Sequence, residues 1–357
     1  MRSTLFALRI LDTQARWVLL SQARLLQAQS ANMARVVSNE ILEKLLKQEL
    51  NTKTLEYTGH FGGGCINEGQ SFKTDTGVVF VKTNKHAGVG LIFLSAAEFS
   101  RSLLHSRVMF EGEFNSLEAL MKTNTVRVPR PVKVLDHPDG NGAMLVMEHL
   151  DLRGLKNPDF QAALGQQLAR LHLHNIEKLN KGDGDAVSKF GFSGATCCGY
   201  ISLTNEWKDD WMDFYVNQRL ENRIQMVLKE NQDQELQDFW AKLKSKIPEY
   251  FTGLEIKPSL LHGDLWGGNV GEIDSGPVIF DPASFYGHHE FELAIAGMFG
   301  GFSTEFYNAY HQLIPKAPGF EERQKLYQLF HYINHWNHFG SSYRPAAISI
   351  MKSLTAI

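Results

Sequence analysis

The segment of residues 260–281 constrains this chain more than any other. It reads Leu-Leu-His-Gly-Asp-Leu-Trp-Gly-Gly-Asn-Val, followed by a turn-rich stretch and the apolar run Pro-Val-Ile-Phe-Asp. The pattern predicts a strand, a loop and a second strand that together hold Asp264, Asn269 and Asp281. A turn alone also favours Gly, Asp and Asn, but it does not require His262 together with these three residues at this spacing.

Asp264 and Asn269 are separated by four residues, and Asp281 follows an apolar strand, a spacing typical of phosphoryl-transfer catalytic loops. We expect Asp264 to accept the proton of an attacking hydroxyl. We expect Asn269 and Asp281 to bind Mg²⁺, because this hard cation takes amide and carboxylate oxygens.

A second phosphate-binding element is predicted within residues 58–82. The run Gly62, Gly63 and Gly64 lies between two predicted antiparallel strands, and a third strand ends near Lys82. Glycine amides can approach phosphates closely, so the loop would cover the nucleotide phosphates and the lysine would reach their oxygens. Taken alone, the glycine run fits an ordinary hairpin turn equally well.

Such a lysine needs an acidic partner, which we expect from the helix predicted around residues 109–120. Its position favours Glu113 over Glu111. Glu111 and Glu118 fit a solvent-exposed helix face just as well.

The strand predicted at residues 143–150 is expected to end in the hinge between two lobes. There the backbone groups of Met147, Glu148, His149 and Leu150 would meet the adenine edge of ATP. A buried strand followed by a helix start describes the same residues without a ligand.

The composition excludes several other classes of protein. A length of 357 residues allows two lobes, and the net charge of −3 argues against a nucleic-acid binder with a large basic face. No run reaches the roughly 18 to 20 apolar residues of a membrane span. Three cysteines, two of them adjacent, do not suggest a disulfide framework, so a reducing compartment is expected.

The N-terminal region, residues 1–40, is rich in Arg and poor in acidic residues, as organellar presequences are. We therefore expect a cytoplasmic protein, or a mitochondrial one if this region is a targeting segment. A helical or unstructured extension remains the alternative. The folded part is expected to comprise an N-lobe at residues 41–148 and a helical C-lobe at residues 149–357.

Three motifs resemble the fructosamine-3-kinase and ketosamine-3-kinase family. They are His-Gly-Asp-Leu-Trp-Gly-Gly-Asn at 262–269, Phe-Asp-Pro-Ala-Ser-Phe-Tyr-Gly-His at 280–288 and Asn-His-Trp-Asn-His-Phe-Gly at 334–340. The resemblance implies an α+β, bilobal, protein-kinase-like fold similar to aminoglycoside phosphotransferases, with a small β-rich N-lobe and a larger helical C-lobe.

The same resemblance implies ATP and Mg²⁺ as cofactors and the C3 hydroxyl of a ketosamine as acceptor. The substrates would be ribulosamine, psicosamine or fructosamine groups on glycated proteins or small amines, with deglycation as the result. Asp264 would be the base, and Trp266 and His335 would face the sugar. Neither nucleic acid nor membrane is expected as a partner.

Residues 87–108 depart from the family pattern as an apolar insertion after the lysine strand. If the insertion displaced the next helix, the Lys82–Glu113 pair would fail. The chain would then be a catalytically impaired ATP-binding regulatory protein. A kinase of another small hydroxylated amine, such as an aminoglycoside or a choline-like compound, is a further alternative.

Cys65 lies in the glycine loop, where nearby amides favour a thiolate. It is a candidate redox switch, so the protein is expected to be a monomer or a redox-linked homodimer. The alternative is a small residue that fills a turn.

Overall fold

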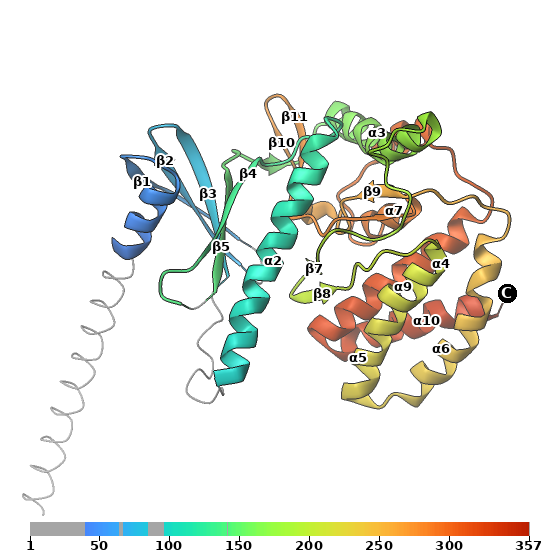
Figure 1. Ribbon diagram of the computed structural model, residues 1–357. Coiled ribbons are helices and arrows are strands. Elements are labelled where there is room, and N and C mark those ends of the chain that lie inside the picture. Colours follow the sequence, from blue (N-terminus) through green and yellow to red (C-terminus); the bar gives the residue numbers. More distant parts are fainter. Residues whose placement is uncertain (1–39, 64–66, 85–95, 141, 357) are drawn as a thin grey trace, which may run out of the picture.

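A computed structural model describes residues 40–63, 67–84, 96–140 and 142–356 (Figure 1). The predicted targeting segment at 1–39, Gly64, Cys65 and residues 87–95 lie outside the described part. Within that part, none of the helices is both long and apolar enough to cross a membrane.

The N-terminal lobe is built on one five-stranded antiparallel sheet, in the order β1-β2-β3-β5-β4. Its strands are β1 (Leu55–Gly63), β2 (Glu68–Thr74), β3 (Gly77–Asn84), β4 (Pro131–Asp136) and β5 (Ala143–Glu148). Strands β1 and β2 are the two predicted antiparallel strands, and β3 is the predicted strand that carries Lys82. The three strands are neighbours in the sheet in chain order.

The inner strand β5 is apolar on both faces because each face is covered by a helix. Met144 and Val146 pack with Leu46 of the helix at residues 40–49. Leu145 and Met147 belong to the main core, which also contains apolar residues of α2 (Ala96–Lys122). Successive side chains of a strand point to opposite faces, so one apolar run serves both helices.

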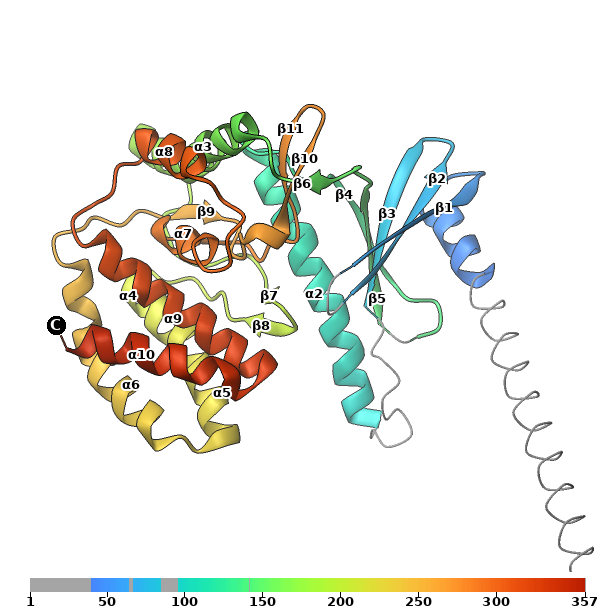
Figure 2. The same cartoon turned by 180° about the vertical axis from the view of Figure 1, so that it is seen from behind.

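The C-terminal lobe is mainly helical, and α2 runs between it and the sheet (Figure 1, Figure 2). Its helices are α3 (Pro158–Lys181), α4 (Trp211–Asp213), η1 (Phe214–Glu221), α5 (Asn222–Asn231), α6 (Gln234–Lys246), η2 (Ile247–Phe251), η3 (Gly267–Asn269), α7 (Glu290–Ala296), α8 (Thr304–Leu313), α9 (Phe320–Phe339), η4 (Ser341–Tyr343) and α10 (Arg344–Thr355). Its strands are β6 (Arg153–Gly154), β7 (Thr196–Cys198), β8 (Ile201–Leu203), β9 (Ser259–Leu261), β10 (Val270–Ile273), β11 (Gly276–Ile279) and β12 (Phe285–Gly287).

The long helix α3 shows how local sequence sets the boundaries of these elements. Asn157 caps its N-terminus by accepting a hydrogen bond from the Asp159 amide at 2.9 Å, and Pro158 occupies the first turn. Gly182 ends the helix at φ 68°, a left-handed conformation that suits glycine.

Part of the predicted insertion at residues 87–108 is helical. Helix α2 begins at Ala96, so residues 96–108 are the first turns of the helix that carries Glu113. They extend the helix at its N-terminal end and do not displace it. The expectation that this segment could disrupt the Lys82–Glu113 pair is therefore wrong for its helical part.

Candidate active site

The catalytic loop lies between β9 and β10 and is tied to the strand that precedes Asp281. The His262 imidazole Nε2 donates to the Phe280 carbonyl at 2.9 Å, so Nδ1 is free to accept from the Asp264 amide at 3.3 Å. Asn269 Nδ2 donates to the Asp264 backbone carbonyl at 2.9 Å and to its Oδ2 at 3.3 Å. The loop thus holds both predicted residues against each other.

Gly263 permits the close turn that this loop makes. Its φ is 85°, and a Cβ at this position would come within 2.1 Å of the Ala283 carbonyl oxygen. Any side chain here would push the loop away from the segment after Asp281.

Glu292 of α7 holds the catalytic loop through hydrogen bonds to its backbone. This fully buried carboxylate accepts hydrogen bonds from the His262 amide and, at 3.0 Å, from the Gly263 amide. Sequence reasoning missed Glu292. The available signal was an acidic residue within the apolar run of residues 291–296, which indicates a buried carboxylate with partners.

Lys82 contacts acidic residues from both lobes. Its Nζ lies 2.9 Å from both carboxylate oxygens of Glu113 and 3.0 Å from Asp281 Oδ1. Burial alone would lower the pKa of Lys82, but Asp281 and Glu113 outweigh it and raise that pKa, so the ammonium stays charged. Glu111 instead pairs with Arg107 at 2.8 Å on the same helix.

Asp281 adopts a backbone conformation that is uncommon for a residue with a side chain. Its φ is 58°, and its side chain is 43% exposed, facing the cavity described below. Left-handed backbone at a non-glycine residue costs free energy and often marks a functional site. At Asp281 this strained backbone conformation accompanies a carboxylate that lines the cavity.

The Asp264 carboxyl has the protonation behaviour of a base that works near neutral pH. Burial raises its pKa to about 7, and the nearby Asp281 and Glu292 carboxylates add to the rise, while hydrogen bonds from Cys198 and Asn269 oppose it. A general base is most effective when its pKa is close to the working pH.

A cavity of about 410 Å³ joins these groups to an aromatic rim. Lys82, Glu113, Asp264, Asn269 and Asp281 line its charged end. The rim consists of Trp266, Phe299, His335, Phe339 and Tyr343. Ring centroids lie 6.2 Å apart for Trp266 and Phe299 and 5.2 Å apart for Phe299 and His335. The two predicted sugar-facing residues are therefore brought together with Asp264.

Of the predicted nucleotide-binding residues, Lys82 and Glu113 line this cavity, whereas the other described ones do not. Gly62 and Gly63 end β1, and Met147 and Glu148 end β5. The amides of Glu148 and His149 donate to the carbonyls of Arg130 and Val78. These two amides could therefore bind the adenine edge of ATP only if they left these carbonyl acceptors. Leu150 follows them outside the strand.

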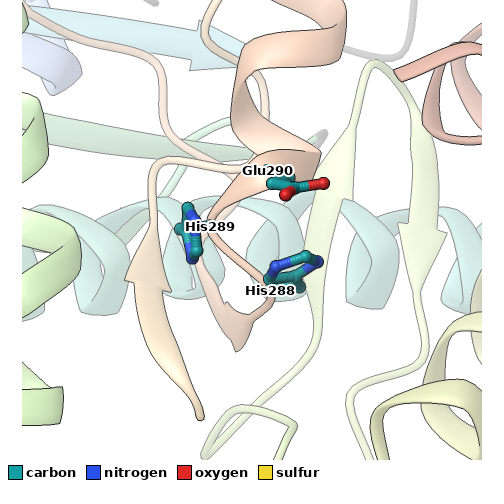
Figure 3. Close-up of side chains that lie close together, drawn as sticks. All are labelled: His288, His289 and Glu290. Atoms are coloured by element: carbon teal, nitrogen blue, oxygen red, sulfur yellow. The ribbon is translucent and has the colours of Figure 1, made fainter. Parts of the chain in front are cut away.

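A separate cluster at the start of α7 could resemble a metal site, but its side chains have other partners (Figure 3). Both carboxylate oxygens of Glu290 accept from the Arg323 guanidinium, at 2.7 and 2.8 Å. His288 Nδ1 hydrogen-bonds the Tyr327 hydroxyl at 2.7 Å, and His289 packs beside it. The adjacent guanidinium disfavours a cation, so we interpret the cluster as structural.

A five-stranded lobe, a helical lobe, a Lys–Glu pair and an Asp-to-Asn catalytic loop define a protein-kinase-like phosphotransferase. The family model for fructosamine kinase matches residues 37–356. The chain therefore belongs to the fructosamine kinase family.

Relatives and solved structures agree with this assignment. The chain is 53% identical over 328 residues to ketosamine-3-kinase of Mus musculus, covering 88% of this chain and 100% of that protein. It is 38% identical over 320 residues to the chloroplastic protein-ribulosamine 3-kinase of Oryza sativa subsp. indica, covering 89% and 84% of the two chains.

Two crystal structures support the predicted fold. One, described as a fructosamine-3-kinase of Haemophilus somnus, has a TM-score of 0.69 at 22% identity and covers 88% of this chain and 96% of that chain. An aminoglycoside phosphotransferase in ternary complex with AMP-PNP and hygromycin B has a TM-score of 0.55 at 12% identity, covering 88% and 97%. The predicted bilobal, protein-kinase-like fold and the family resemblance are both confirmed.

Proposed function

We propose that this protein uses ATP to phosphorylate the C3 hydroxyl of ketosamines. The observation that carries the proposal is the Asp264 carboxylate in a cavity that also holds Lys82 and an aromatic rim. The 53% identity to a ketosamine-3-kinase over that protein's whole length supports the same substrate class.

In this mechanism Asp264 accepts the proton of the C3 hydroxyl as its oxygen attacks the γ-phosphorus of ATP. The bond from phosphorus to the bridging oxygen breaks, and ADP leaves. Lys82, fixed by Glu113, neutralises phosphate oxygens. Such positioning and charge neutralisation supply most of the catalysis in phosphoryl transfer.

The residues at the charged end fit a magnesium ion. Asp281 offers a partly exposed carboxylate, and the Asn269 amide nitrogen is engaged by Asp264, which leaves the amide oxygen for a cation. Oxygen donors of this kind match the preference of Mg²⁺. When bound, the ion would neutralise phosphate charge as the γ-phosphoryl group is transferred.

Phosphorylation at C3 provides a chemical route to deglycation. Loss of a C1 proton converts the product into its 1,2-enaminol, which can expel phosphate from C3. Hydrolysis of the resulting unsaturated imine releases the amine. The expected substrates are therefore glycated proteins or small ketosamines, with Trp266 and His335 facing the sugar.

The two alternatives have less support. A regulatory protein that only binds ATP was motivated by a displaced helix, yet the Lys82–Glu113 pair is formed. For an aminoglycoside or choline-like acceptor, the resemblance at 12% identity concerns the fold alone.

The test is ATP consumption with ribulosamine, psicosamine and fructosamine amines, beside an aminoglycoside. We expect turnover with ketosamines that is lost in Asp264→Asn. Asp274→Asn is the matched control, because Asp274 lies in an exposed position where it pairs with Arg153. Turnover with the aminoglycoside alone, or equal turnover in Asp264→Asn, would contradict the proposal.

A further inference from the structure

A cysteine that the mechanism above does not use lies beside the Asp264 carboxylate in the cavity. Cys198 ends β7, lines the cavity and is 5% exposed. Cys198 and Asp264 line the same cavity, and an interaction with the Cys198 thiol is among the causes that lower the pKa of Asp264. Asn269 Nδ2 donates to Oδ2 of the same carboxylate, so the thiol would be a second donor from a separate element.

A buried chain of donors fixes the direction of this thiol. Arg223 Nε donates to Asn334 Oδ1 at 2.9 Å, and Asn334 Nδ2 donates to Cys198 Sγ at 3.3 Å. A guanidinium has donors only, so the Asn334 oxygen must face it and the amide nitrogen must face the sulfur. The sulfur is thereby an acceptor from Asn334, and its own proton is left for Asp264.

The far end of this chain is rigid. Arg223 is 1% exposed, and its other nitrogens donate to Asn222 Oδ1 and to the Ser202 carbonyl, both at 2.9 Å. Asn334 is 3% exposed. The chain therefore links α5, α9 and β7 to the catalytic loop through buried groups.

The thiol keeps its proton in this setting. Burial raises the pKa of Cys198 well above its ordinary value, and the facing Asp264 carboxylate raises it further. A protonated thiol is a weak donor, but a charged acceptor in a buried site strengthens the bond.

We propose that Cys198 is a positioning residue for phosphoryl transfer: aimed by Asn334 and Arg223, its thiol holds the Asp264 carboxylate in the orientation that receives the acceptor proton. This inference rests on the proposed function. Cys197 and Cys198 both line the cavity, so position alone does not distinguish them. The hydrogen bond from Asn334 assigns the role to Cys198.

Cys197 provides the matched control. It precedes Cys198 in the same strand and is half-buried. Replacing it with alanine removes a cavity-lining thiol without removing the proposed bond.

The test compares steady-state kinetics of Cys198→Ala, Cys198→Ser and Cys197→Ala with a ketosamine and MgATP. We expect Cys198→Ala to lower kcat about fivefold to tenfold, the size expected for the loss of one ordinary hydrogen bond, with both KM values nearly unchanged. Cys198→Ser should restore most of kcat because its hydroxyl can donate in the same direction. Cys197→Ala removes the neighbouring thiol but not the proposed bond, so it should lower kcat less than Cys198→Ala does.

A double variant and a second substitution separate positioning from packing. In an Asp264→Asn background, Cys198→Ala should cause no further loss of residual rate, because both changes act on one interaction. Asn334→Asp keeps the shape of the side chain and its contact with Arg223, yet places an acceptor against the sulfur. It should draw the thiol proton away from Asp264 and lower kcat while thermal unfolding changes little.

Two results would overturn the inference: full kcat in Cys198→Ala, or equal losses in Cys198→Ala and Cys198→Ser. A wild-type protein without ketosamine turnover would instead overturn the proposed function, so the two failures are distinguishable.

Discussion

The Asp264 carboxylate combines two demands that oppose each other. As the proposed base it must be charged to accept a proton, yet burial and the facing Asp281 and Glu292 carboxylates favour its protonated form. Donors from Asn269 and Cys198 offset part of that cost. The balance leaves a base whose charge changes close to neutral pH.

This balance predicts the pH dependence of the reaction. Because the pKa of Asp264 is raised to about 7, kcat/KM for the ketosamine should increase with pH through this value and level off above it. The measurement is a kcat/KM profile at fixed ionic strength with saturating MgATP. An acidic limb centred near the ordinary aspartate pKa of about 4 would show that burial does not control this group.

Residue positions along the chain explain which site residues could be predicted. Asp264, Asn269 and Asp281 lie on one continuous segment made of β9, the catalytic loop and the hairpin of β10 and β11, so their spacing alone brings them together. Glu292 and Cys198 reach the same loop from α7 and β7, and their roles arise only from tertiary packing. No periodicity or spacing reports such contacts.

At the scale of elements, α7 has two buried carboxylates that contact different parts of the protein. Glu290 pairs with Arg323 within the helical lobe, whereas Glu292 accepts amides of the catalytic loop. Glu290→Gln and Glu292→Gln should both lower the free energy of unfolding, because a charge-assisted hydrogen bond is worth about 1.5–3 kcal/mol. Only Glu292→Gln should also lower kcat. Urea unfolding and steady-state kinetics of both variants provide the comparison, and equal kcat values would contradict the anchoring role.

Gly112 sets the distance between α2 and β7. A Cβ here would lie 2.4 Å from the Ala195 carbonyl oxygen and 3.0 Å from Thr196 Cα, both backbone atoms. Gly112→Ala should therefore push the helix away, move Glu113 relative to Lys82, and cost about 1–3 kcal/mol of stability. We expect a lower kcat/KM by steady-state kinetics. Gly184→Ala, with nothing within 4 Å of the added carbon, is the control and should behave like the wild type.

Element prediction succeeded where the sequence has a long, regular pattern. The first three strands were predicted from such patterns. The start of α2 was not, because its first turns at residues 96–108 were interpreted as an insertion. Strands of two to four residues, such as β6 and β10, are too short for alternation to distinguish them from loops.

At the scale of the whole molecule, Lys82 is the charged contact between the lobes inside the cavity. It extends from β3 of the N-terminal sheet, pairs with Glu113 of α2, and reaches Asp281 of the C-terminal lobe at 3.0 Å. Because Lys82 and Glu113 are both nearly inaccessible, each depends on the other for neutralisation. The same contact that we propose to position phosphate thus contributes to the stability of the fold.

This dual role predicts a stability rescue without a rescue of activity. Lys82→Met should cost about 3–5 kcal/mol, because removing one partner of a buried ion pair leaves Glu113 uncompensated. Glu113→Gln on that background should restore most of the loss by removing the stranded charge, yet the double variant should remain inactive because no cation is left to neutralise phosphate. Urea unfolding and ketosamine-dependent ATP consumption would be measured on the same samples.

A second lysine–glutamate pair supplies the control for this comparison. Lys133 and Glu49 pair on the surface, where the lysine side chain is 47% exposed, so Lys133→Met should change stability by at most about 1 kcal/mol and leave turnover intact. If Lys82→Met cost no more than Lys133→Met, the ion pair between the lobes would serve catalysis alone. If the double variant stayed as unstable as Lys82→Met, the loss would come from the packing of the Lys82 side chain, because removing the charge of Glu113 would then have relieved nothing.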